Sequence, residues 1–308
     1  MTPVDQRTGS AAINGELWGA RARDWAELQE GGRRLDFEHC IRSTGIGPGT
    51  RVLDVGCGAG GFCRLAAAAG ASVTGIDAAA GMIEVARERV PNVRFDVGDI
   101  QFLPYEDRSF DVVAGFHSFP FAAQPLEALR EARRVANPGA TVFIVVFGRE
   151  DHNQLASVLH AIRALLPTMP PGAPGPLSLS APGTLAELVA RAGLTVTEYG
   201  HLETAYAYPD RETALRAIRS AGLTVLAERT AGQPAVVTAL AGALAPYRTS
   251  TGGYRLAVES TYITATAWPH SRRPARSRSA LSSTITSQQR SAPTLSSVPD
   301  LASRIQRR

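Results

Sequence analysis

The sequence predicts an α/β protein built on a doubly wound, mainly parallel sheet of seven strands. Two observations carry this prediction. Strand-like and helix-like patterns alternate from residue 50 to about 148, and a glycine-rich loop follows the first strand in VLDVGCGAGG, residues 52–61. Such alternation is typical of βαβ units, whose strands run parallel. The 308 residues, 44% of them hydrophobic, suffice for a large domain with a substantial core.

Each element of the first half has its own signal. The strands are expected where short runs are apolar or β-branched, at residues 51–55, 72–77, 93–99, 110–116 and 141–148. The helices are expected between them, at residues 61–70, 79–90 and 125–136. Gly70 suits the left-handed end of the first helix, and Pro91 prevents the second from continuing. Asn137-Pro138-Gly139 is expected to form a turn.

The second half has a looser pattern. Residues 166–183 hold too many Pro and Gly for regular structure and predict a long exposed loop. Further elements are expected as a helix at 184–193, a sixth strand at 194–200, helices at 211–222 and 233–247, and a last strand at 254–267. The long gap before the last strand suggests helices inserted above the sheet. Upstream, Trp18 and Trp25 lie seven residues apart and predict one face of an N-terminal helix.

Charge divides the chain at about residue 268. The net charge is +4, but from Pro269 onward eight arginines stand against one acid, so this segment carries +7 and the remainder −3. The segment is rich in Ser, Arg and Pro without an apolar period, which predicts a disordered tail over residues 269–308. No apolar run of about 18 residues and no signal peptide is seen, so a cytoplasmic protein without a membrane span is expected.

The three cysteines, Cys40, Cys57 and Cys63, are odd in number and form no C-x-x-C pair. This pattern argues against a disulfide framework and against a zinc site, so reduced thiols and no bound metal are expected.

The glycine loop raises the question of its ligand. Gly56, Gly58 and Gly61 satisfy G-x-G-x-x-G, which is typical of a dinucleotide pyrophosphate site at a helix N-terminus. Asp54, however, stands two residues before the first glycine. A carboxylate about 4 Å from a phosphate charge would cost on the order of 4 kcal/mol at an effective dielectric of 20. Asp54 therefore favours a ligand that carries a cationic amine and a sulfonium.

Two further acids end the next two strands. Asp77 follows Gly58 by 19 residues, where a carboxylate can accept both hydroxyls of a ribose, although nicotinamide enzymes share this feature. Asp99 ends the third strand, where it can accept from the exocyclic amine of adenine while Ile100 covers the ring edge. Three acids on three successive strand ends indicate an adenosine with a positively charged tail.

With these motifs the chain resembles the class I S-adenosylmethionine-dependent methyltransferases, particularly the small-molecule group that includes the quinone-biosynthesis C-methylases. The resemblance covers roughly residues 13–267. It is carried by VLDVGCGAGG, VTGIDAAAGMIEVAR, GDIQFLPYEDRSFDVV and ALREARRVANPGATVFI, in order and at matching spacing. It implies a Rossmann-like methyltransferase fold. The chain departs from the usual pattern at Ala136-Asn137-Pro138-Gly139-Ala140, and the segment after residue 268 has no counterpart.

The resemblance also implies how the cofactor S-adenosylmethionine is bound. The backbone at Gly56 and Gly58 would lie along its methionine part with Asp54 near the ammonium, and Met82 would pack on the adenine face. An alternative for Met82 is ordinary core packing. The full set of expected cofactor contacts is Asp54, Gly56, Cys57, Gly58, Gly60, Asp77, Ala78, Met82, Asp99, Ile100 and Phe116.

The candidate general base is His117, which follows the fourth strand in GFHSFPF. Methyl transfer needs a base only where the acceptor must lose a proton, so the alternative is a histidine that merely faces the pocket. Phe116, Phe119 and Phe121 are expected to form an apolar wall. Ser118-Phe119-Pro120-Phe121 also approaches the signature of amino-group methyltransferases, with one proline missing. His152, His160 and His201 fit no metal motif.

We therefore expect a methyltransferase for a small, apolar or aromatic metabolite. Its domain would span residues 1–268, with the cofactor half at about 50–148 and a substrate roof at about 13–45 and 149–250. The mildly acidic domain does not favour nucleic acid. The alternatives are an RNA or DNA methyltransferase that uses the basic tail, and a non-catalytic cofactor-binding protein.

Overall fold

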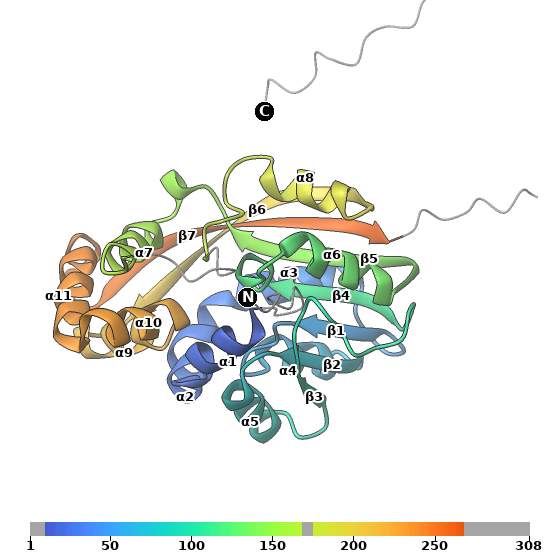
Figure 1. The fold of residues 1–308 in the computed structure, drawn as a ribbon, viewed down its shortest axis with the longest axis horizontal. Helices are drawn as coiled ribbons and strands as arrows, with labels where there is room; N and C mark the ends of the chain where they lie inside the picture. The colour runs from blue at the N-terminus through green and yellow to red at the C-terminus, as the bar shows by residue number, and fades with distance from the viewer. Residues whose placement is uncertain (1–9, 168–174, 268–308) are drawn as a thin grey trace, which may run out of the picture. The chain divides into compact units, whose positions relative to one another are not determined.

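A seven-stranded sheet in the order β3-β2-β1-β4-β5-β7-β6 runs through residues 10–167 and 175–267, which this computed structural model describes (Figure 1). The strands β1 to β5 pair in parallel, and β7 is antiparallel to both β5 and β6. The predicted mainly parallel sheet is therefore confirmed. The strands are β1 Arg51–Val55, β2 Ser72–Asp77, β3 Arg94–Val97, β4 Phe110–Phe116, β5 Ala136–Phe147, β6 Leu194–Tyr208 and β7 Tyr254–Ala267.

Helices cover both faces of the sheet (Figure 1). They are α1 Ala11–Gly19, α2 Ala22–Asp24, α3 Arg34–Thr44, α4 Gly61–Ala68, α5 Ala80–Arg89, α6 Pro125–Val135, α7 Leu155–Arg163, α8 Thr184–Arg191, α9 Arg211–Arg219, α10 Gly222–Ala231 and α11 Gln233–Leu244. Short 3-10 or π turns are η1 Trp25–Gln29, η2 Glu30–Arg33, η3 Phe119–Phe121, η4 Glu150–His152 and η5 Ala245–Tyr247.

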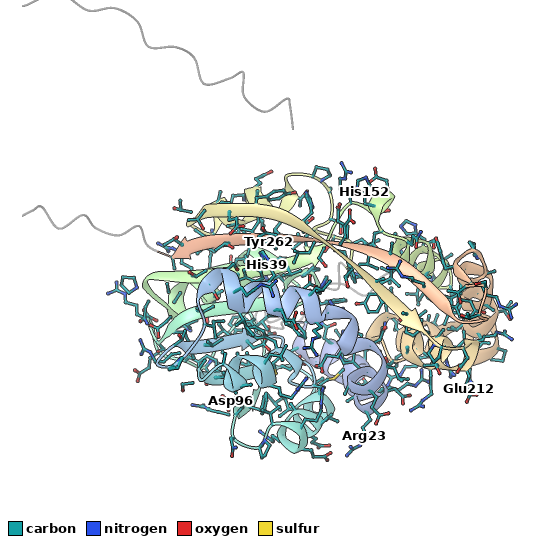
Figure 2. All side chains as sticks on the ribbon, turned by 180° about the vertical axis from the view of Figure 1, so that it is seen from behind. Arg23, His39, Asp96, His152, Glu212 and Tyr262 are labelled. Atoms are coloured by element: carbon teal, nitrogen blue, oxygen red, sulfur yellow. The ribbon has the colours of Figure 1, made fainter. Side chains whose placement is uncertain are left out.

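The central strands are apolar on both faces because each face is buried. In β1, Leu53 and Val55 pack with α6 and α8, whereas Val52 packs with α3, α4 and α5. Neighbouring side chains of a strand point to opposite faces, so a continuous apolar run serves two helical layers. Figure 2 shows His39 of α3 beside Tyr262 of β7, and their ring centroids lie 4.4 Å apart.

A third apolar cluster extends the fold beyond the parallel strands. It joins α7, α9, α10 and α11 to the far ends of β6 and β7, where Tyr206, Leu256 and Val258 are buried. These helices gather at one end of the sheet in Figure 1. The helices expected before the last strand are thus present, and the sequence patterns missed α7 and α10.

The sheet order places a ligand crevice between β1 and β4. The chain winds from β1 toward β3 on one side and from β4 toward β5 on the other. In such sheets the helices of the two halves lie on opposite faces and leave an opening at the carboxyl ends of the two central strands. Asp54 lies near the end of β1 at this edge, the glycine loop follows β1, and His117 follows β4.

Several expected elements differ from the structure. Asn137-Pro138-Gly139 is not a separate turn: it lies inside β5, in an irregular stretch where the register jumps between Phe110 and Val112 of β4 and Gly139 has a φ of 81°. The expected single helix through Trp18 and Trp25 breaks into α1, α2 and η1. Strand β6 extends eight residues beyond its predicted end at 200. The predicted tail at 269–308 and residues 168–174 of the predicted loop lie outside the described residues.

The N-terminal segment, residues 10–37, is fastened to the sheet edge by a buried carboxylate. Glu30 accepts a hydrogen bond from the backbone N–H of Gly61 at 3.0 Å and an ion pair from Arg89 Nη1 at 2.6 Å. Its side chain is only 7% exposed. Gly61 begins α4, so the carboxylate caps a helix N-terminus, where negative charge is favoured. None of the described helices is both long and apolar enough to span a bilayer.

We predict that Glu30→Ala destabilises the fold, because it leaves Arg89 and the Gly61 N–H without their acceptor. Breaking a buried pair costs about 3–5 kcal/mol, and since Arg89 is 30% exposed we expect about 2–4 kcal/mol. Urea unfolding followed by circular dichroism measures this. Glu27→Ala, whose side chain is 62% exposed, is the matched control. Equal free energies of unfolding for the two variants would contradict this anchoring role of Glu30.

Candidate functional site

The glycine loop is shaped by hydrogen bonds to its backbone. The N–H groups of Gly56 and Cys57 both donate to the carbonyl of Ile76, at 2.8 and 3.0 Å, and that of Gly58 donates to Asp77 Oδ2 at 2.9 Å. Gly56 has a φ of 77°, and a Cβ there would lie 2.3 Å from Ser118 Cβ. The turn thus requires glycine for both its conformation and its close approach to the end of β4.

A pocket of about 880 Å³, counted to the solvent at its mouth, opens beside this loop. All but one of the residues predicted from the sequence line it: Asp54, Gly56, Cys57, Gly58, Asp77, Ala78, Met82, Asp99, Ile100, Phe116 and His117. Elements far apart in the sequence therefore converge at the carboxyl edge of the sheet.

Gly60 is the predicted residue that the structure does not bring into the pocket lining. It has a φ of 82°, and a Cβ added to it would approach Ala86 and Phe95 at 3.2 Å. Both neighbours belong to the core between α5 and β3. Gly60 thus lets the loop turn into α4 against that core, and its contact with a cofactor stays a prediction.

Backbone amides hold Asp77, which ends β2, and Asp99, which lies two residues past the end of β3 at Val97 and not in the strand as expected. Asp77 accepts from Gly58 through one carboxylate oxygen and from the N–H of Ala79, at 2.9 Å, through the other. Asp99 accepts from the backbone and side-chain nitrogens of Gln101. Burial raises the pKa of Asp77, and the amide donors oppose that shift. Each oxygen of Asp77 retains a lone pair for a further donor.

Asp54 is the most deeply buried of the three acids, with 2% exposure. Its Oδ2 accepts from the Cys63 thiol at 3.2 Å, and its Oδ1 has no hydrogen-bond partner among the described residues. Burial raises the pKa of Asp54 to about 8, with smaller contributions from the charges of Glu30 and Asp77. A cation at this position would favour the ionised carboxylate and fill the missing contact.

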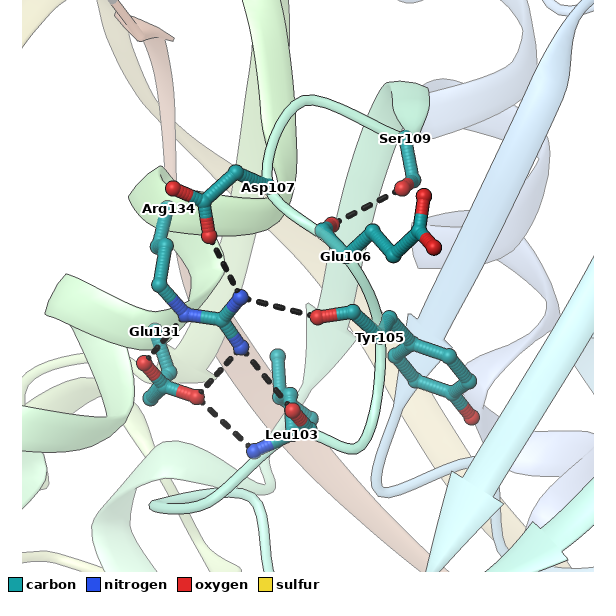
Figure 3. Close-up of polar contacts among 7 residues, drawn as sticks. All are labelled: Leu103, Tyr105, Glu106, Asp107, Ser109, Glu131 and Arg134. Atoms are coloured by element: carbon teal, nitrogen blue, oxygen red, sulfur yellow. Dashed lines mark hydrogen bonds and ion pairs between the residues drawn. The ribbon is translucent and has the colours of Figure 1, made fainter.

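The segment that carries Asp99 is anchored to α6 by one arginine (Figure 3). Arg134 donates to the carbonyls of Leu103 and Tyr105 at 2.9 and 2.8 Å and pairs with Asp107 and Glu131. Glu131 in turn accepts from the N–H of Leu103 at 2.9 Å. These bonds fix the loop between β3 and β4 and so hold Asp99 and Ile100 at the pocket.

His117 adopts an unusual backbone conformation at the end of β4. Its φ is 57°, a left-handed value that non-glycine residues rarely take. Such strained residues cluster at functional sites. The side chain is 5% exposed and lines the pocket, and its ring lies 4.4 Å from that of Phe147. Burial, followed by the charge of Arg33, lowers the pKa of His117 to about 4, so the imidazole is neutral at pH 7.

Asp36 of α3 is the polar partner of this histidine. Asp36 Oδ2 lies 3.4 Å from His117 Nε2 and accepts from Ser260 Oγ at 3.2 Å. In the tautomer that donates from Nε2 to Asp36, the lone pair of the neutral ring is on Nδ1. Among the described residues, His117 Nδ1 and the hydroxyl of Ser118 are buried and have no partner. Both residues line the pocket.

Aromatic side chains line the rest of this end. The ring of Phe116 lies 4.8 Å from that of Phe37 and 4.6 Å from that of Phe62. Trp18 packs edge-on against Phe121 at 5.3 Å. The expected wall of Phe116, Phe119 and Phe121 is right for the first and last. It is wrong for Phe119, which is fully buried in the core cluster of α6 and α8.

Glu30, Arg33 and Phe37 are among the pocket residues that the sequence analysis did not name. They lie in the N-terminal segment, outside every motif. Many of their contacts are with distant residues, such as Gly61, Phe62 and Phe147. The signal in the sequence was their place shortly after Trp25, which the sequence assigned to an N-terminal helix.

The downstream part of the predicted roof differs from expectation. No residue of 149–167 or 175–250 lines the pocket. Helix α10 instead supports the N-terminal segment, with Glu228 paired to Arg21 and Gly222 against the ring of Trp18. His152 and His201 flank the buried Glu259, at 3.0 and 3.5 Å, and also lie outside the lining.

The pocket fits an adenosine with a cationic tail. The orphan Oδ1 of Asp54 needs a donor, and a Cβ on Gly58 would meet nothing closer than Trp25 Nε1 at 3.6 Å, so the loop backbone is open on that side. Asp77 and Asp99 offer acceptors further along the edge. The helix end that would bind a pyrophosphate is already capped by Glu30, which accepts from the N–H of Gly61.

Comparison with known proteins gives the same assignment. A family model described as a methyltransferase domain matches residues 53–144. The chain is 34% identical over 127 residues to a demethylmenaquinone methyltransferase of Renibacterium salmoninarum. The match covers 41% of this chain and 54% of that protein. The chain thus spans about half of that relative's length. Among solved structures, the YcgJ protein of Bacillus subtilis has the same fold, with a TM-score of 0.53 and 20% identity. The match covers 77% of this chain and 99% of that protein.

A malonyl-[acyl-carrier protein] O-methyltransferase of Erwinia pyrifoliae matches over a longer range. It is 33% identical over 213 residues, which cover 68% of this chain and 75% of that protein. The chain therefore belongs to the class I S-adenosylmethionine-dependent methyltransferases, a family whose methyl donor is S-adenosylmethionine.

Proposed function

We propose that this protein transfers a methyl group from S-adenosylmethionine to a small, apolar or aromatic metabolite by in-line displacement. The observation that carries the proposal is the aromatic end of the pocket, where Phe37, Phe62 and Phe116 enclose a space beside the glycine loop. The two curated relatives are named for different acceptors, so their names do not fix the acceptor class, and the lining of this pocket is the better guide.

The cofactor would be held by the three strand-end acids. Asp54 would face its ammonium, Asp77 its ribose hydroxyls and Asp99 its adenine amine, with Met82 beneath the ring. When bound, this cofactor supplies an electrophilic methyl group on a sulfonium. The protein's own contribution is to hold the acceptor in line, and such positioning can lower the barrier by about 7–11 kcal/mol.

His117 would act as the general base. Its neutral imidazole at pH 7 has a free lone pair on Nδ1, and Asp36 orients the ring through Nε2. A base of this kind would take the proton from an acceptor whose nucleophilic atom carries one, a step that typically contributes about 100- to 10,000-fold. The enclosed walls of the pocket would exclude water from that proton transfer.

We predict that methyl-labelled S-adenosylmethionine will label compounds in the small-molecule fraction of a bacterial extract. Separate incubations with the RNA and DNA of the same extract test the alternative substrate. His117→Asn should lower the label in small molecules, because the base is removed. Label confined to RNA or DNA would overturn the small-molecule proposal.

We predict that Asp77→Ala weakens binding of S-adenosylhomocysteine by about 2–4 kcal/mol, because two charge-assisted hydrogen bonds to the ribose are lost. Asp99→Ala should cost less, since it removes one contact. Isothermal titration calorimetry measures both, with Asp151→Ala, whose side chain is 73% exposed, as control. Unchanged affinity in folded Asp77→Ala would remove Asp77 from the site, and saturable NAD binding would argue against the cofactor.

We predict that His117 makes the fold less stable in mild acid. Its pKa falls from about 6.5 unfolded to about 4 folded, so between these values the unfolded chain binds the extra proton and stability falls as pH falls. From pH 7 to pH 5 the wild type should lose about 2 kcal/mol relative to His117→Asn. Asparagine tolerates the positive φ and does not titrate. If the free energies of unfolding in urea change equally with pH in the two proteins, this would contradict a buried neutral histidine.

A further inference from the structure

Arg33 is a buried cation that the proposed function leaves without a role. It ends η2 and lines the pocket, and its residue exposure is 8%. Within residues 10–167 and 175–267, its Nε and Nη1 atoms are buried without a hydrogen-bond partner, and no carboxylate lies within ion-pair distance. Burying an unpaired charge is costly, and a bound anion would supply a counter-ion for this guanidinium.

Neither neighbouring acid lies within ion-pair distance of Arg33 among the described residues. Glu30 bonds Gly61 and Arg89. One oxygen of Asp36 faces His117 and Ser260, and its other oxygen has no hydrogen-bond partner in the described part of the chain. Arg33 contacts instead the rings of Trp25 and Phe147, at 5.3 and 5.6 Å from their centroids. These cation–π contacts fix the position of the guanidinium but use none of its N–H donors.

The guanidinium lies between the glycine loop and the far side of the pocket, because Trp25 is beside Gly58 and Phe147 ends β5. Strand β5 is two strands away from β1, or about 10 Å across the sheet at the usual spacing of about 4.8 Å. His117 follows the strand between them, and its ring also contacts Phe147. Arg33 and the base therefore share one aromatic neighbour.

We propose that Arg33 binds a carboxylate of the methyl acceptor, so that the substrate is an aromatic acid whose ring lies among the phenylalanines of the pocket. The inference rests on the proposed function, since it takes the pocket as the acceptor site. In the reaction, the nucleophilic atom bonds the methyl carbon, the C–S electron pair stays on sulfur, and the departing proton goes to His117 Nδ1. The carboxylate on Arg33 is unchanged.

The test compares benzoate with its neutral analogue benzamide on the full chain loaded with S-adenosylhomocysteine. Calorimetry should show benzoate binding at least about 10-fold more tightly than benzamide, in line with a charge-assisted hydrogen bond. Arg33→Met should abolish that preference and Arg33→Lys should keep part of it. The adjacent Arg34→Met, whose side chain is 67% exposed, should bind as the wild type does.

Three outcomes would overturn the inference. The first is a wild-type protein that binds benzoate and benzamide with equal affinity. The second is a folded Arg33→Met protein that keeps the preference for benzoate. The third is an Arg33→Met protein that loses S-adenosylhomocysteine but still binds 5′-methylthioadenosine, because Arg33 would then serve the carboxylate of the cofactor. If the wild type fails to bind S-adenosylhomocysteine at all, the proposed function itself fails.

Discussion

The candidate site depends on one constraint, the satisfaction of the backbone amides in the glycine loop. The carbonyl of Ile76, the carboxylate of Asp77 and the carboxylate of Glu30 each accept from this loop, and they come from two segments, the end of β2 and η2. A loop of this composition has no side chains of its own to define its shape. Its geometry is therefore set from outside, and the same acids that shape it also line the pocket.

This arrangement links the cover of the pocket to its floor. Glu30 lies in the N-terminal segment, Arg89 ends α5, and Arg89 also donates to the carbonyl of Ala59 in the loop. At the other end of the segment, Asn14 donates to the carbonyl of Phe121 at 2.8 Å. A segment tied to both sides of the crevice encloses the reacting groups, which strengthens electrostatic interactions by excluding water.

The sequence predicted best where local pattern and burial agree. Strands β1, β2, β4 and β7 have their expected bounds, because their apolar and β-branched residues face buried layers. Asn137-Pro138-Gly139 misled because an irregular strand and a turn use the same residues. Arg33 and Asp36 lay outside prediction for a different reason: their roles arise from contacts with Phe147 and His117, more than 80 residues away, which no local pattern encodes.

The insertion of β7 between β5 and β6 has a consequence for synthesis of the chain. Strand β6 pairs only with β7, and the outer edge of β5 also waits for it. Until residues 254–267 leave the ribosome, a nascent chain that has already folded its parallel strands leaves the outer edge of β5 and the facing edge of β6 with unpaired main-chain donors and acceptors. Open edges invite pairing with other chains. The last strand thus ends the interval in which this protein is most exposed to aggregation.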